Sequence, residues 1–107
     1  MKKMSYKKAA IIYRTRGDNT ELCNDFAEVW CSNEYLEKAP VPSDWRKHVT
    51  IWGYFGLIRE DFESFSDSIT RAGSDIKIEN RWRYLCGCAW NVIRVIREIA
   101  EEGEDLD

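Results

Sequence analysis

Two cysteines one residue apart, Cys86 and Cys88, and the one histidine, His48, are the side chains of this 107-residue chain best suited to metal or nucleophilic chemistry. Together with Cys23 and Cys31 they could form a zinc site, because zinc prefers thiolate and imidazole ligands. Residues two positions apart on a helix point about 160° away from each other, so a helical Cys86 and Cys88 cannot hold one ion. The C-x2-C spacing that presents two thiolates together is also missing from the sequence. We therefore predict free thiols and no metal site.

An enzyme built on these residues is the least favoured alternative. A catalytic cysteine needs a neighbouring base, and nothing in the sequence brings His48 close to a cysteine. The sequence also lacks a phosphate-binding loop, a nucleophile elbow and a metal-binding helix motif. We predict that the protein is not an enzyme, has no catalytic residues and requires no cofactor.

The stretch from Arg81 to Glu102 carries residues suited to recognition. On a helix, five of them would lie within about 80° of one another and form a ridge: Arg83, Gly87, Trp90, Arg94 and Arg97. Trp and Arg are enriched in binding hot spots, and the same set could contact phosphates and stack on a base. We predict a partner-binding ridge. The alternatives are that the N-terminal residues, or a second copy of the chain, cover Trp90.

Charge alternates in blocks along the chain, although the net charge is only −3. Residues 1–17 carry +6 and residues 18–44 carry −6, and the later blocks carry +3, −4, +4 and −6. This balance excludes a uniformly basic nucleic-acid-binding surface, but it is compatible with basic patches on parts of the surface. The candidates for a nucleic-acid-binding arm are Lys2, Lys3, Lys7, Lys8, Arg14 and Arg16. The candidates for an acidic binding surface are Glu60, Asp61, Glu63 and Asp67.

Apolar residues recur every three or four positions over residues 79–102, which predicts a long C-terminal helix. Its apolar stripe contains Ile78, Trp82, Leu85, Ala89, Ile93, Ile96 and Ala100, and Val92 and Ile99 widen it. We expect this whole stripe to pack into the core.

A second helix is predicted over residues 18–39. Asp18 is a candidate N-cap with Glu21 three positions later, as in a capping box. Pro40 ends this helix, because proline lacks the N–H that a helix interior requires.

Residues 43–72 show the same helical periodicity. We expect two helices there, because Gly53 and Gly56 would each cost about 1 kcal/mol inside a helix. Gly73 is a natural C-terminal cap.

The fold predicted from these segments is mostly α: a compact bundle or orthogonal array of four to five helices. A short β-hairpin that pairs residues 9–15 with residues 74–79 is an alternative, because both runs are too short for periodicity to decide. We expect one domain over residues 1–107, with flexible tails at 1–4 and 103–107.

No run in the sequence reaches the ~20 apolar residues that a membrane span requires. The apolar run Ala9–Tyr13 is too short for a signal peptide. We therefore expect a cytoplasmic protein with reduced thiols and no membrane partner.

The sequence "NRWRYLCGCAWNVI", from Asn80 to Ile93, resembles the closing helix of small proteins encoded by phages and plasmids, including replication-initiation accessory proteins. In both, an aromatic pair precedes small residues and a further aromatic-polar pair. The resemblance covers about 14 residues and implies an origin in a mobile element. It assigns no role to any particular residue.

These features together favour a protein-binding module. The acidic blocks could occupy a basic groove of a host nucleic-acid machine, as an anti-defence or anti-CRISPR-like inhibitor would. The alternative is a DNA- or RNA-binding accessory protein that uses the N-terminal arm and the Arg83, Arg94 and Arg97 ridge. Pairing with a second copy of the chain is compatible with either function.

Overall fold

A computed structural model describes residues 5–105, with side chains up to Ile99. It contains five α-helices: α1 (Tyr6–Arg16), α2 (Thr20–Ser32), α3 (Trp45–Tyr54), α4 (Arg59–Ala72) and α5 (Arg81–Asp105). Two short 3-10 turns, η1 (Gly73–Asp75) and η2 (Ile78–Asn80), join α4 to α5. The prediction of a mostly α protein is confirmed.

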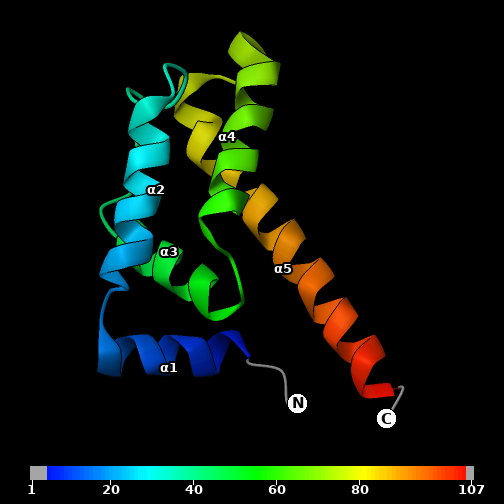
Figure 1. Ribbon diagram of the computed structural model, residues 1–107. Helices are drawn as coiled ribbons and strands as arrows, with labels where there is room; N and C mark the ends of the chain where they lie inside the picture. Colours follow the sequence, from blue (N-terminus) through cyan, green and yellow to red (C-terminus); the bar gives the residue numbers. More distant parts are fainter. Residues whose placement is uncertain (1–4, 106–107) are drawn as a thin grey trace.

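The helices form an orthogonal array (Figure 1). α2 and α4 run side by side, α3 packs against α2, and α1 crosses beneath α3. α5 packs on α4 with its first half, and its second half extends away from the other helices. In the described part of the chain, no helix is both long and apolar enough to cross a membrane.

The predicted β-hairpin is wrong. Residues 9–15 lie in the middle of α1, and residues 74–79 contain the end of η1, a two-residue link and the start of η2. The side chain of Ser5 accepts a hydrogen bond from the Lys8 N–H at 3.1 Å and starts α1, and Ala9 then anchors the helix as a fully buried residue. The alternation of apolar residues in 74–79 does not produce a strand, because no partner strand is present among residues 5–105.

The second predicted helix is shorter than expected, and its N-cap lies one residue later. Asn19, not Asp18, caps α2, and its Oδ1 accepts a hydrogen bond from the Leu22 N–H at 3.1 Å. The Asp18 carboxylate instead accepts a hydrogen bond from the Tyr13 hydroxyl at 2.8 Å. α2 ends at Ser32, and turns occupy the region up to α3.

Residues 43–72 form two helices, as predicted. The chain reverses between α3 and α4 at Gly56, whose φ of 107° lies in a region that favours glycine. Asp61 accepts a hydrogen bond from the Ile58 N–H at 2.9 Å and caps the start of α4. Gly73 ends α4 with a φ of 55°, and its N–H donates to the Ile69 carbonyl.

A cluster of aromatic rings joins four helices in the core. The Phe26 ring of α2 lies 5.2 Å from Phe62 of α4 and 6.0 Å from Trp82 of α5, measured between centroids. Trp82 also stacks on Trp52 of α3 at 5.7 Å. Trp52 is fully buried, and its Nε1 has no acceptor among the described residues. Trp52 and Trp82 therefore connect α3 and α5 at the centre of the molecule.

The prediction that the whole apolar stripe of α5 packs into the core is wrong at its ends. Ile78 is 41% exposed and Ile99 is 63% exposed, while the side chain of Ala100 lies outside the described residues. The members that are buried or half-buried are Trp82, Leu85, Ala89, Val92, Ile93 and Ile96. Ile78 lies in η2, before α5 begins. At the other end the physical reason is length: 25 residues of α5 span about 37 Å, against about 21 Å for the 14 residues of α4 that support it.

Candidate functional site

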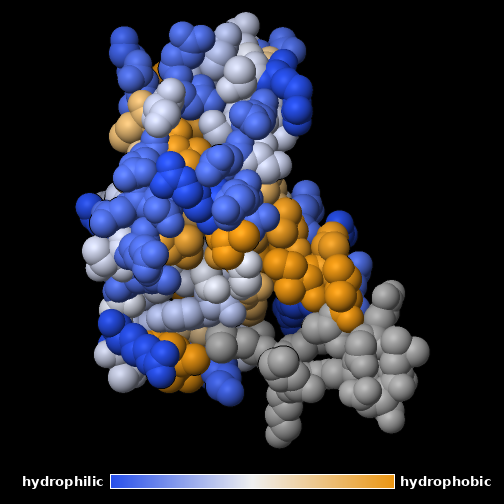
Figure 2. Space-filling view, viewed as in Figure 1, coloured by the Kyte–Doolittle hydropathy of each residue, from blue (hydrophilic) through white to orange (hydrophobic). Residues whose placement is uncertain are grey.

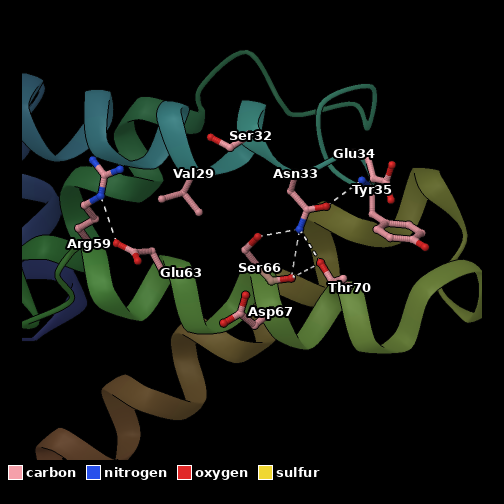
Figure 3. Close-up of a pocket in the computed structure, with 10 residues that line it drawn as sticks. All are labelled: Val29, Ser32, Asn33, Glu34, Tyr35, Arg59, Glu63, Ser66, Asp67 and Thr70. Carbon is pink, nitrogen blue, oxygen red and sulfur yellow. Dashed lines mark hydrogen bonds and ion pairs between the residues drawn. The ribbon is translucent and has the colours of Figure 1, made fainter.

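An open groove of about 590 Å³ lies between α2 and α4 (Figure 3). Three carboxylates line it, from Glu34, Glu63 and Asp67. The other lining residues are mostly polar: Val29, Ser32, Asn33, Tyr35, Arg59, Ser66 and Thr70. Small-molecule pockets are predominantly apolar, so this groove suits a charged, hydrogen-bonding segment of a partner better than an apolar ligand.

Arg59 stands at one end of the groove and ties α4 to α2. Its Nη1 donates hydrogen bonds to Asp25 Oδ1 at 3.1 Å and to Glu28 Oε2 at 2.7 Å. Its Nε donates to Glu63 Oε1 at 3.2 Å. The hydrogen bond with Glu28, followed by those with Asp25 and Glu63, raises the pKa of Arg59 above its already high ordinary value. The guanidinium is therefore a permanent positive charge among three carboxylates.

A second groove, of about 430 Å³, lies on the other side of Arg59. Its carboxylates come from Glu21, Asp25 and Glu60. Arg59 lines both grooves, so the two form one continuous surface along α2 and α4. We call this surface the acidic strip and define it by seven carboxylates: Glu21, Asp25, Glu28, Glu34, Glu60, Glu63 and Asp67. Figure 2 shows mostly hydrophilic side chains over these two helices.

The sequence predicted only part of the acidic strip. Glu60, Glu63 and Asp67 belong to it, whereas the carboxylate of Asp61 is engaged in capping α4. The α2 half was missed: Glu21, Asp25, Glu28 and, just beyond the helix, Glu34. A signal for it existed, because residues 21, 25 and 28 follow the spacing of one helix face. That α2 and α4 lie side by side could not be read from this spacing.

Asn33 holds the groove in shape where α2 ends. Its Nδ2 donates to Ser66 Oγ at 2.7 Å and to Thr70 Oγ1 at 2.8 Å. Its Oδ1 accepts from the Tyr35 N–H at 2.8 Å. One side chain therefore ends α2 and fixes it against α4, so the groove walls are formed before any partner binds.

The predicted ridge of α5 lies on the surface. Arg83, Gly87, Arg94 and Arg97 are exposed, and no other residue would approach a Cβ at Gly87 within 4 Å. Trp90 is 38% exposed and packs between Tyr6 of α1 and Phe55, with ring centroids 5.9 Å from each. Both readings of Trp90 thus hold in part: an N-terminal residue covers one side of the ring, and the rest faces solvent.

Four of the six basic residues predicted as a nucleic-acid-binding arm lie on α1. Lys7 and Lys8 are exposed in the first turn of α1, which is the end of the helix where Tyr6 contacts Trp90. Arg14 and Arg16 are exposed at the other end of α1, about 9–14 Å further along the helix. Lys2 and Lys3 lie outside the described residues. The structure therefore brings only the start of α1 near the ridge.

The cysteines and His48 are spread over the fold. Cys23 is buried, with its Sγ 3.7 Å from Thr50 Oγ1, and Cys31 is exposed on the surface of α2. His48 is half-buried, and its Nε2 lies 3.4 Å from Asp44 Oδ2. Cys86 and Cys88 are both half-buried on α5. Among the described residues, no three His, Cys, Asp or Glu side chains are grouped closely enough to hold a metal ion.

Burial predicts an order of thiol reactivity. Desolvation raises the pKa of Cys86 to about 11 and also raises the pKa of Cys23 and Cys88. Only the thiolate reacts, so at about pH 8 we expect a thiol reagent to label Cys86 about a hundredfold more slowly than exposed Cys31. Mass spectrometry of the labelled peptides measures this order, and labelling in denaturant provides the control. Labelling of Cys86 as fast as Cys31 in the folded protein would contradict the burial of Cys86.

Comparisons of this chain with protein-family models, with curated proteins and with solved structures found no match. The fold and the site define an all-α protein with an acidic strip between two helices and a basic, aromatic ridge on a third. These two surfaces are the basis for proposing a function.

Proposed function

We propose that this protein is a protein-binding module whose acidic strip binds a Lys- and Arg-rich surface of a partner. The observation that carries the proposal is the strip itself, in which seven carboxylates from two helices and the turn after α2 line one surface and Arg59 pairs with three of them. Six of these residues are exposed, and Asp25 is half-buried. A surface of one sign attracts the opposite sign and accelerates association with it.

The partner that fits this chemistry best is the nucleic-acid-binding surface of a host protein. Such surfaces are rich in Lys and Arg because they neutralise phosphates. The acidic strip would take the place of the phosphates and inhibit the partner by competition. The resemblance of residues 80–93 to proteins of phages and plasmids favours an inhibitory role of this kind.

A charge-neutralising variant tests the proposal. The triple change Glu34→Gln, Glu63→Gln and Asp67→Asn removes three charges from the strip without changing side-chain shape. We expect it to weaken binding of a labelled arginine-rich peptide about tenfold, measured by fluorescence anisotropy at low salt. The matched control changes three exposed acids outside the strip: Glu37→Gln, Asp75→Asn and Glu79→Gln. Equal losses in both triple variants would mean that only net charge matters, and the proposal would fail.

A nucleic-acid-binding function is the second candidate, favoured by the contact of Tyr6 with Trp90. This contact brings the end of α1 that carries Lys7 and Lys8 next to Trp90, which lies on the ridge with Arg83, Arg94 and Arg97. The same preparation titrated with duplex DNA, single-stranded DNA and RNA at low salt separates the two candidates. Salt-sensitive binding that Arg94→Glu and Arg97→Glu abolish would support the second candidate over the first.

A further inference from the structure

α5 carries an apolar seam whose first two residues pack partly against the core and whose last two are exposed. The seam consists of Cys88, Val92, Val95 and Ile99, spaced by four, three and four residues. Val95 is 46% exposed and Ile99 is 63% exposed, and the other two are half-buried. Figure 2 shows apolar surface along the part of α5 that extends past the other helices. Steps of four and three are those of a coiled-coil seam, in which each apolar side chain packs against a second helix.

The seam is separate from the ridge. On a helical wheel, its four residues lie within about 60° of one another, while Trp90 and Arg94 lie on the other side of the core-facing residue Ile93. A helix can therefore bind at the seam without covering the ridge, and neither surface lies on α2, which carries half of the acidic strip.

The spacing of the seam matches that of a second copy running in the opposite direction. The spacing of four, three and four residues is the same in both directions along the helix. An antiparallel copy therefore places Cys88 against Ile99 and Val92 against Val95. Both contacts then occur twice, as a two-fold interface requires. No apolar residue of the seam is left without an apolar counterpart.

The distribution of charge along α5 favours this orientation, because it keeps the acidic segments of the two copies apart. Residues 81–97 carry four arginines and no acid, and residues 98–105 carry five acids and no base. Antiparallel pairing places residues 98–105 of one copy beside residues 82–89 of the other, a segment that contains no acid. Parallel pairing would place the two acidic segments beside each other, and they would repel.

We infer that two copies of this chain pair through an antiparallel contact of their α5 helices, centred between Val92 and Val95. The contact buries a short seam of about 16 Å along each helix. Small interfaces are typical of weak, reversible complexes, so the dimer dissociates on dilution. A dimer presents two acidic strips, and a partner with two basic sites would be bound more tightly by avidity.

Sedimentation velocity over a range of concentrations tests the pairing. We expect the wild-type protein to form a dimer as its concentration rises, and the variant Ile99→Glu to weaken dimerisation more than tenfold. The matched control is Ile11→Glu, which makes the same change at an isoleucine of α1 that is 52% exposed. We expect Ile11→Glu to dimerise like the wild type. A wild-type protein that remains monomeric at all concentrations, or equal effects of both variants, would overturn the inference.

Cross-linking tests the orientation. In a Cys31→Ser background, which removes the exposed thiol, we expect Ile99→Cys to form an intermolecular disulfide with Cys88 of a second copy upon mild oxidation. The two positions of one helix are about 16 Å apart, too far for a disulfide within the chain. Without Ile99→Cys, antiparallel pairing holds the two Cys88 residues apart and gives no cross-link. A cross-link between the two Cys88 residues in this control would show parallel pairing and overturn the inference.

Discussion

Replacing Trp52 with alanine is expected to lower the free energy of unfolding by about 3–5 kcal/mol, the largest effect of any single change considered. Trp52 is fully buried, and its ring contacts Trp82 at 5.7 Å and His48 at 6.2 Å between centroids. Alanine leaves a cavity where α3 meets α5, and the surrounding rings can fill it only in part. Urea denaturation followed by circular dichroism measures the loss.

Two further tryptophan variants make this test specific. Trp90→Ala removes a ring that is 38% exposed, so we expect a loss of only about 1–2 kcal/mol. Trp52→Phe keeps an aromatic ring and removes the Nε1–H that has no acceptor among the described residues. An unpaired buried donor costs about 1–3 kcal/mol, so Trp52→Phe should cost far less than Trp52→Ala. Equal losses for Trp52→Ala and Trp90→Ala would contradict the central position of Trp52.

Replacing Arg59 with glutamine is expected to lower stability and, under the proposed function, to strengthen partner binding. The change removes the cation that holds Asp25, Glu28 and Glu63 together, so these carboxylates repel one another across α2 and α4. The melting temperature should fall at low salt. At about 1 M salt, charges are screened over a distance of about 3 Å. We therefore expect this salt to restore about half or more of the lost melting temperature. The same change adds net negative charge to the acidic strip and should increase affinity for the arginine-rich peptide.

Arg71→Gln is the matched control for Arg59→Gln. Arg71 is an exposed arginine on the same helix, and it donates a hydrogen bond to the neighbouring Ser68 at 3.2 Å. Both variants change the net charge equally. A melting temperature that falls equally in the two variants, or a loss at Arg59 that salt does not reduce, would show that the charge network is unimportant. A variant Arg59→Gln that is less stable but binds the peptide more tightly would show the trade-off between stability and function that is typical of binding sites.

Several parts of the fold and of the site followed from local sequence patterns. Steps of three and four residues predicted the helices, because this periodicity places apolar side chains on one face whatever the helix packs against. Gly73 was recognised as a cap, since the positive φ observed there suits glycine best. The exposed Arg83, Arg94 and Arg97 were placed on one ridge by the same helical geometry.

Other features depended on which helices meet, and only the tertiary structure decided these. The sequence of residues 9–15 is compatible with a helix or a strand, and the packing of α1 against α3 selects the helix. The acidic strip exists because α2 and α4 lie side by side, which brings Asp25 and Glu28 to Arg59 across more than 30 residues of sequence. The exposed end of the α5 seam, at Val95 and Ile99, arises because the helix is longer than the body that supports it. The physical reason is that helical periodicity acts over three or four residues, whereas the pairing of helices is the sum of many weak contacts between distant parts of the chain.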